Sequence, residues 1–389
     1  MQYFIIIYPY KVNQFVYNTF EIEHLKKCSN IYLLDISMIA NKNFTKALSY
    51  DHIEDNETVI VIRSWRFFIK TLFRLRSEIK YSKLNIIDET PFDPNLKELF
   101  ANILFRFIFR KKNRNTIKIL NHGIPIIEEE KETKSKNKIS ILLNRIINKY
   151  ILIYDTFLLA GKKYELLYSK LVLGKKILKG STNDFSQSLI DSNKSPKTLV
   201  ESSNYAVFID GAGPLFTSDS FLLKTKIYFS VENWYPSLSS FFDFVESKTN
   251  KRVHIAGHYK SKHPEVSPYF GNRNVFYDKT KELIKNCSFV ITRNSTAISY
   301  AVIYNKPIIF ICSNETICDL NQMVYINYLV NILNSKLINI DDYKTDLNFK
   351  EYLMINRSSY GNFKYNYLTS CDSQNLKPNF QVLLQNNSN

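Results

Sequence analysis

Residues that could do chemistry follow three apolar runs in the second half of this 389-residue sequence. The first is Asp210, which ends the run Tyr205–Ile209 and precedes Gly211-Ala212-Gly213-Pro214, small residues that give a ligand room to approach the backbone. This carboxylate could act as a base or a nucleophile, or it could cap the next turn. The Gly-x-Gly lacks both the full dinucleotide-binding pattern and a helix directly after it, so it predicts no dinucleotide site.

Three of the six histidines lie between positions 254 and 263. His254 alternates with apolar residues inside a predicted strand, which favours a packed position, whereas His258 follows the strand end. His263-Pro264 lies in the loop beyond, and Lys260 and Lys262 lie between His258 and His263. No carboxylate pair or cysteine accompanies these histidines at ligand spacing, so they favour an anion, such as a phosphate or a sugar carboxylate, over a metal.

A third candidate follows the run Phe289–Thr292. Asn294, Ser295 and Thr296 stand at the start of a helix predicted over 295–304. The free amides and the positive end of a helix, together with the two hydroxyls, would suit a phosphate. The same residues could serve as an N-cap, and both roles share one geometry.

The elements that must position these residues alternate between apolar runs and helical patterns. Strands are predicted at 3–8, 31–36, 58–62, 84–87, 117–120, 205–209, 252–256, 274–277, 288–292 and 307–312. Helices are predicted at 13–27, 65–79, 93–109, 234–248, 280–286 and 295–304. Continuous Ile/Val/Leu strands between helices are typical of parallel sheets buried on both faces, where ligands bind beyond the carboxyl ends of the strands.

The polar, Ser-rich stretch 188–204 predicts a linker between two such units. We therefore expect an α/β protein with two Rossmann-like domains facing a cleft, one over residues 1–190 and one over residues 205–389. Within the first domain, His122 follows a predicted strand and is either a candidate acceptor-site residue or a plain loop histidine.

Composition excludes several classes of protein. With 45% hydrophobic residues, 28 Phe and 26 Tyr, the chain cannot remain disordered. No run of about 18 apolar residues predicts a transmembrane helix, and the first residues do not resemble a signal peptide, so we expect a cytoplasmic protein. The five scattered cysteines form no Cys-x-x-Cys pair and indicate reduced thiols rather than zinc or disulfides.

The formal charge of +16 favours an anionic partner, although an AT-rich coding sequence could account for part of it. The clearest cluster comprises Arg63, Arg66, Lys70, Arg74 and Arg76, followed by the aromatic and basic run Phe105–Lys112. Aromatic residues mixed with cations suit an anionic membrane surface. Alternatively, the aromatic residues pack inward and the cations form a solvated face.

The stretch from Thr292 to Ile311 resembles the donor-nucleotide element of GT-B glycosyltransferases. Asp210, the His258–Pro264 loop and Ser295-Thr296 together resemble bacterial surface-polysaccharide transferases that use CMP-activated ulosonic acids (Kdo, sialic acid and pseudaminic acid). These families carry an acidic motif, a His-Pro motif and a Ser-Ser/Thr motif in the same order. Here Gly211 stands where a second acidic residue is frequent, and Tyr259 rather than Pro follows His258.

The resemblance implies that the enzyme moves a ulosonic acid from a CMP donor to a cell-surface glycan in capsule or lipopolysaccharide biosynthesis. Asp210 would be catalytic together with His258, and either His258 or His263 would contact the CMP phosphate. The donor-binding residues would be Lys260, His263, Pro264, Asn294, Ser295 and Thr296. His122 would bind the acceptor. No metal and no cofactor is implied, and the enzyme would be peripheral on the inner face of the cell membrane.

Two other functions remain open at this stage. A GT-B enzyme that uses a UDP-sugar, either a transferase or an epimerase, would need a carboxylate to hold the ribose, and Glu315 or Asp319 could do so. A non-catalytic nucleic-acid-binding protein would fit the charge and the 14% aromatic content, but no finger, RRM or KH module is recognisable. Our expectation is therefore no nucleic-acid partner.

Overall fold

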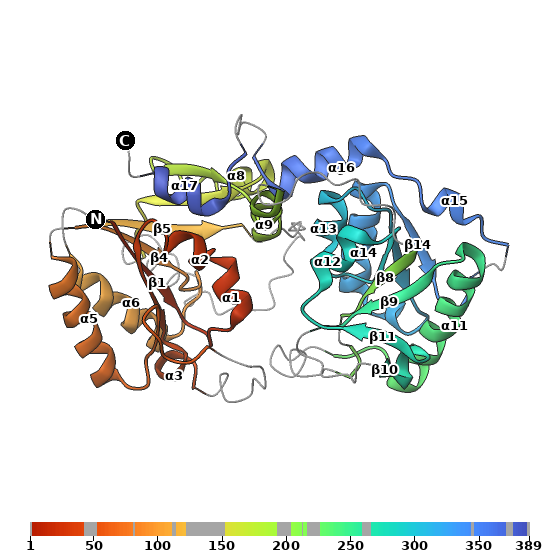
Figure 1. The fold of residues 1–389 in the computed structure, drawn as a ribbon, viewed down its shortest axis with the longest axis horizontal. Helices are drawn as coiled ribbons and strands as arrows, with labels where there is room; N and C mark the ends of the chain where they lie inside the picture. The colour runs from red at the N-terminus through yellow and green to blue at the C-terminus, as the bar shows by residue number, and fades with distance from the viewer. Residues whose placement is uncertain are drawn as a thin grey trace. The chain divides into compact units, whose positions relative to one another are not determined.

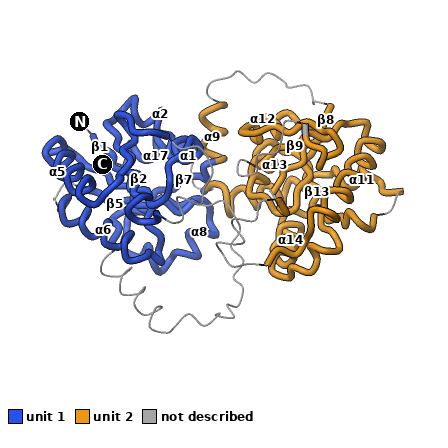
Figure 2. Tube along the Cα trace, turned by 90° about the horizontal axis from the view of Figure 1, so that it is seen from below, with its two compact units in different colours: residues 1–122, 128–183, 370–389 blue, residues 123–127, 184–369 orange. Residues whose placement is uncertain are grey.

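The computed structural model describes residues 2–42, 53–80, 82–110, 114–121, 152–192, 204–211, 213–215, 226–258, 266–343, 346–370 and 376–386 (Figure 1). These residues form two compact units, coloured separately in Figure 2. Unit 1 comprises residues 1–122, 128–183 and 370–389, and unit 2 comprises residues 123–127 and 184–369. Each unit is a layered α/β domain.

Within the described residues, unit 1 has a seven-stranded parallel sheet. Its strands are β1 (Gln2–Tyr8), β2 (Asn30–Asp35), β3 (Val59–Val61), β4 (Lys83–Asp88), β5 (Arg114–Leu120), β6 (Thr156–Ala160) and β7 (Lys176–Gly180). Their order in space is β3-β2-β1-β4-β5-β6-β7. The first six strands follow the Rossmann order, in which the sheet grows outward in both directions from β1 and β4.

Helices cover both faces of this sheet (Figure 1). One face packs against α3 (Ser37–Ala40), α5 (Trp65–Ile79) and α6 (Leu96–Ile108), and the other against α1 (Gln14–Thr19), α2 (Ile22–Leu25) and α17 (Asn379–Gln385). Helix α8 (Lys162–Leu167) follows β6. Helix α5 begins where the Ser64 hydroxyl accepts from the Phe67 amide, and α6 begins with a capping box between Asn95 and Glu98.

The described part of unit 2 also forms one seven-stranded sheet. Its strands are β8 (Tyr205–Ile209), β9 (Arg252–Ala256), β10 (Val266–Ser267), β11 (Arg273–Phe276), β12 (Val290–Thr292), β13 (Ile308–Cys312) and β14 (Lys336–Asn339). The order is β10-β11-β9-β8-β12-β13-β14, and β10 alone among these strands runs antiparallel, against β11. The six parallel strands repeat the Rossmann order of unit 1.

Helix α11 (Val231–Thr249) packs on one side of this sheet, with an aromatic core that includes Trp234, Phe241 and Phe242. Figure 1 shows α12 (Thr280–Asn286) and α13 (Ile298–Ile303) on the other side. The remaining helices are α14 (Leu320–Leu333), α15 (Phe349–Tyr352) and α16 (Arg357–Phe363), with short turns at Pro268–Phe270, Thr316–Cys318 and Lys364–Leu368. None of the helices that the structure describes is long and apolar enough to cross a bilayer.

The unit boundaries differ from the predicted ones at two places. The stretch predicted as the start of a linker is largely helical: α9 (Asn183–Ser192) belongs to unit 2 from Asp184 onward, where Asp191 pairs with Lys281 at 2.5 Å. The chain then ends in unit 1 rather than in unit 2, because Asn379 exchanges two hydrogen bonds with the Ser181 backbone at 2.9 and 2.8 Å. Both differences come from contacts between residues far apart in the sequence.

Candidate functional site

The strand order of unit 2 creates a switch point between β8 and β12. The chain leads from β8 to β9 on one side and from β12 to β13 on the other, so the loops after β8 and β12 diverge. In open α/β sheets this divergence leaves a crevice at the carboxyl ends of the two strands, where ligands bind. The residues that directly follow these strands are Asp210 and Arg293.

Asp210 is held firmly at the end of β8. Its backbone amide donates to the Ala256 carbonyl at 3.0 Å and so continues the pairing of β8 with β9 by one residue. The side chain is only 3% exposed. Its negative charge reaches Tyr235, because burial and then the Asp210 charge raise the pKa of that phenol well above its usual range. The predicted candidate is therefore a fixed carboxylate at the switch point.

Arg293 brings a cation to the same place. Its guanidinium carbon lies 4.4 Å from the centre of the Phe229 ring and 5.9 Å from that of the Trp234 ring. Burial lowers the pKa of Arg293 to about 10, while the Asp319 and Asp210 carboxylates oppose that effect. The side chain therefore keeps its charge at neutral pH. Arg293 was not among the predicted site residues, although its place directly after a strand was a usable signal.

Asn294, Ser295 and Thr296 lie in the loop after Arg293. The predicted helix over 295–304 begins three residues later, at Ile298, and has six residues. The Ser295 hydroxyl accepts from the Ala297 amide at 3.2 Å, and Asn294 donates to Gln322 in α14. Thr296 is exposed. The three residues thus share the carboxyl edge of the sheet with Asp210, but they form a turn before the helix rather than its first turn.

Of the remaining predicted site residues, the structure describes His258, the second catalytic candidate. It is half-buried and lies two residues beyond β9, the strand that pairs with β8, so it stands at the same edge of the sheet. His254, which was expected to be packed, stacks on Tyr205 with ring centres 4.4 Å apart. The centre of its ring also lies 5.3 Å from that of Phe276. Four candidates, namely Lys260, His263, Pro264 and the acceptor candidate His122, lie outside the described residues.

The two carboxylates proposed for a UDP-sugar site both contact helix starts. Glu315 accepts from the Ser230 amide at 2.8 Å and from the Asn233 side chain at 2.6 Å, at the beginning of α11. Hydrogen bonds from Asn233 and then Ser230 hold its pKa below the usual range. Asp319 accepts from the Gln322 amide at 3.1 Å and caps α14.

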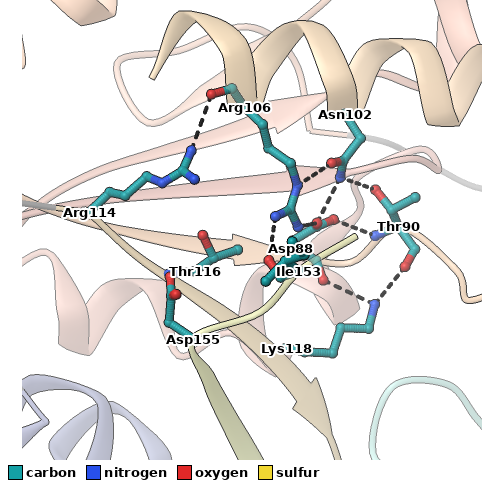
Figure 3. A network of polar contacts seen from close by, with 9 residues as sticks. All are labelled: Asp88, Thr90, Asn102, Arg106, Arg114, Thr116, Lys118, Ile153 and Asp155. Carbon is teal, nitrogen blue, oxygen red and sulfur yellow. Dashed lines mark hydrogen bonds and ion pairs between the residues drawn. The ribbon is translucent and has the colours of Figure 1, made fainter. Parts of the chain in front are cut away.

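Unit 1 has its own switch point, between β1 and β4, and a polar network lies beside it (Figure 3). At the end of β4, Asp88 accepts from Asn102 at 2.7 Å and from Arg106 at 2.8 Å. Lys118, buried on β5, donates to the Asp88 and Thr90 carbonyls at 3.0 and 2.6 Å. Burial alone would raise the pKa of Asp88, but Lys118 and Arg106 outweigh it and hold that pKa below its usual value.

Glu89, the next residue, has a different environment. Its amide donates to the Ile7 carbonyl at 3.1 Å, which places it at the carboxyl end of β1 as well as β4. The Oε1 atom is buried and has no hydrogen-bond partner among the described residues. Burial raises the pKa of this carboxyl, and Lys118 offsets part of the effect. A buried acceptor oxygen without a donor is costly, so it marks a place where a ligand hydroxyl would fit.

The described residues contain no group of three or more His, Cys, Asp or Glu side chains that could hold a metal ion. The chemical groups gathered at the two switch points are carboxylates and cations, of which Lys118 is buried and Arg293 half-buried. Such groups can bind an anion, attack an electrophilic carbon or take a proton from a hydroxyl.

No protein-family model matches the chain, and no curated protein matches its sequence. Solved structures do resemble it. A variant of the wall teichoic acid polymerase TagF superposes with a TM-score of 0.54 at 12% identity, over 100% of this chain and 88% of that one. MurG of Acinetobacter baumannii gives 0.45 at 9% identity over 99% of both chains. The UDP-GlcNAc 2-epimerase of Methanocaldococcus jannaschii gives 0.48 at 11% identity, over 98% and 96%.

The chain has a GT-B-type fold. The expected α/β class with two Rossmann-like domains is thereby confirmed. In this fold the switch point of unit 2, with Asp210 and Arg293, and that of unit 1, with Glu89, occupy equivalent positions in two sheets of the same strand order. At these identities the likeness concerns the fold alone.

Proposed function

We propose that this chain is a glycosyltransferase that moves a ulosonic acid from a CMP-activated donor to a surface-glycan acceptor. The observation that carries the proposal is the placement of a buried carboxylate, Asp210, and a half-buried cation, Arg293, directly after the neighbouring strands β8 and β12 at the switch point of unit 2. A CMP-ulosonate carries two negative groups, the phosphate and the sugar carboxylate, close to its anomeric carbon. A cation beside a carboxylate suits both the charge of this donor and the reaction at that carbon.

In the proposed reaction, a carboxylate oxygen of Asp210 attacks the anomeric carbon. The bond from that carbon to the phosphate oxygen breaks, and its electron pair leaves with CMP. An acceptor hydroxyl then attacks the same carbon, passes its proton to an oxygen of the released CMP phosphate and frees Asp210 as a carboxylate, so that configuration is retained overall. Arg293 would stabilise the negative charge on the departing phosphate, and Ser295, Thr296 and His258 at the same edge of the sheet would add donors.

Acceptor binding belongs to unit 1 in this proposal. The buried Oε1 of Glu89 would accept a hydrogen bond from a hydroxyl of the acceptor sugar, which would satisfy the oxygen that now lacks a donor. The buried ion pair of Asp88 and Arg106 lies beside it and would keep the end of β4 rigid. His122, which lies outside the described residues, stays a predicted acceptor residue.

The test is a nucleotide panel followed by a transfer assay on the full chain. CMP should raise the melting temperature by about 5–10 °C at 100 times its Kd, since that excess stabilises by about 2.7 kcal/mol. Asp210→Ala should abolish transfer while CMP still binds, whereas Arg293→Met should lose CMP binding. Full activity in EDTA is expected, since no metal takes part. Unchanged turnover of Asp210→Ala would remove this residue from the mechanism.

A UDP-sugar enzyme, either a transferase or an epimerase, is the second candidate, because Glu315 presents an ionised carboxylate at the carboxyl end of β13. Its hydrogen bonds to Ser230 and Asn233 engage that carboxylate with α11. The same panel separates the candidates. Stabilisation by UDP and not by CMP would favour this second function, and stabilisation by an oligonucleotide alone would contradict both.

A further inference from the structure

Helix α6 in unit 1 is apolar on two sides. One side, which contains Ala101, Phe105 and Ile108, is buried in the core. On the other side, four apolar residues recur at intervals of four, three and four positions, which aligns them along the helix. They are Leu96, Phe100, Ile103 and Phe107, and their exposed fractions are 84%, 56%, 41% and 72%. We refer to these four residues as the α6 stripe.

Helix α5 lies beside α6 and extends this surface (Figure 1). Trp65, at the start of α5, contacts Phe100 edge-on with ring centres 5.2 Å apart. Ile69 and Phe73 on α5 are 39% and 55% exposed. Large apolar side chains that gather on one surface mark a binding face, whereas single ones are common on any protein.

Cations surround the apolar residues. Arg66, Lys70 and Arg74 recur every four positions along the exposed side of α5, and Lys97 lies near the start of α6. Within the described part of the chain, none of these four forms an ion pair. The two acidic residues of α5 and α6 do not offset them: Glu98 is buried in the capping box, and Glu78 accepts from the Tyr32 hydroxyl.

We propose that the face formed by the α6 stripe and the cations of α5 binds an anionic phospholipid surface. The stripe would enter the boundary between headgroups and acyl chains, and Arg66, Lys70 and Arg74 would contact lipid phosphates. Charge decides against a second copy of this chain, because a self-complementary contact would bring the same cations of two molecules together. An anionic membrane satisfies both the apolar and the charged part of the face.

The proposal does not depend on the nucleotide donor, and it is tested by sedimentation of the full chain with vesicles. Binding should be strong to vesicles that contain phosphatidylglycerol, weak to pure phosphatidylcholine, and lower at high salt. Arg66→Gln/Lys70→Gln/Arg74→Gln should weaken binding on the order of a hundredfold, since each lost cation near an anionic surface costs roughly a factor of five or more. Phe100→Ser/Phe107→Ser should weaken it at least about tenfold.

Matched controls lie elsewhere in unit 1. Lys162→Gln/Lys163→Gln/Lys170→Gln removes the same charge from exposed sites, and Leu173→Ser removes a side chain that is 83% exposed. Both should bind like the wild type, and circular dichroism checks that all variants are folded. Equal loss in the control triple, or no binding to either vesicle, would overturn the proposal. So would a dimer in sedimentation velocity that Phe100→Ser/Phe107→Ser converts to monomer.

Discussion

Two arginine–aspartate pairs in unit 1 allow the energy of the network beside β4 to be isolated. Arg106 lies 2.8 Å from Asp88, with side-chain exposures of 11% and 1%. Arg63 lies 2.9 Å from Asp55, with exposures of 69% and 38%. The chemistry and the length of the two pairs match, and the burial differs. A difference between their effects on stability therefore reports burial together with the further hydrogen bonds of Arg106.

Arg106→Met should destabilise unit 1 by about 3–5 kcal/mol, because it leaves the buried Asp88 carboxylate without one of its cations. Arg106 also donates to the Asn102 side chain and the Ile153 carbonyl, and both would lose a donor. Arg63→Met should cost only about 0.2–1 kcal/mol, since water screens and replaces the exposed pair. The loss of unfolding free energy should therefore be several times larger in Arg106→Met than in Arg63→Met.

Denaturant unfolding, monitored with hydrogen exchange to assign each transition to a unit, measures both variants. Asp88→Asn/Arg106→Met should cost less than the sum of the two single changes, because neither partner is left charged and unpaired. Comparable losses for Arg106→Met and Arg63→Met, or strict additivity in the double variant, would refute the reasoning.

The sign of the pH dependence follows from the lowered pKa of Asp88. A carboxyl whose pKa is lower in the folded state stabilises the protein above its unfolded pKa of about 3.9, and this contribution is lost as the pH falls through the folded value. The stability difference between wild type and Asp88→Asn should therefore be constant near neutrality and shrink in acid.

Two further substitutions test the switch point of unit 2 and the chain end. Gly213→Ala should weaken CMP binding in a thermal-shift titration, because the added Cβ would lie 2.7 Å from the Phe229 ring that stacks on Arg293. Gly211→Ala is the matched control in the same titration, because its Cβ would meet nothing within 4 Å. Asn379→Ala should destabilise unit 1 by about 1–3 kcal/mol and leave unit 2 unaffected, because it removes two buried hydrogen bonds to Ser181. Equal loss of hydrogen-exchange protection in both units would contradict the assignment of the chain end to unit 1.

Elements with a strong local pattern were predicted closely. The helix Trp65–Ile79 and the strands Tyr205–Ile209 and Arg252–Ala256 have the predicted bounds. In these segments the apolar period alone decides the element, because one helix face or a whole strand must be buried. The segment predicted as one helix over 13–27 is instead divided into α1 and α2 at Glu21, whose φ of 53° interrupts the helix.

Segments whose pattern is weak locally were missed. Helix α9 has a polar, Ser-rich sequence that favours a linker, and its stability comes from contacts such as that of Asp184 with Ser299. Helix α17, near the end of the sequence, has no predicted counterpart and is fixed to unit 1 by Phe380, whose amide donates to the Glu21 side chain at 2.7 Å. Neither contact can be inferred from spacing, since the partners lie more than a hundred residues apart.

The candidate site also has a part that the sequence predicts and a part that only the tertiary structure shows. The sequence alone determined that Asp210, His258 and the Asn294–Thr296 segment follow strands of a parallel sheet, because the apolar runs fix the strands and the chain must leave each one at its carboxyl end. Only the tertiary structure decided that β8 and β12 are neighbours, which brings Arg293 and Asp210 to the same edge of the sheet, and that the Oε1 atom of Glu89 is buried within the electrostatic reach of Lys118. Strand order depends on which surfaces pack together across the whole domain, and no local pattern records that choice.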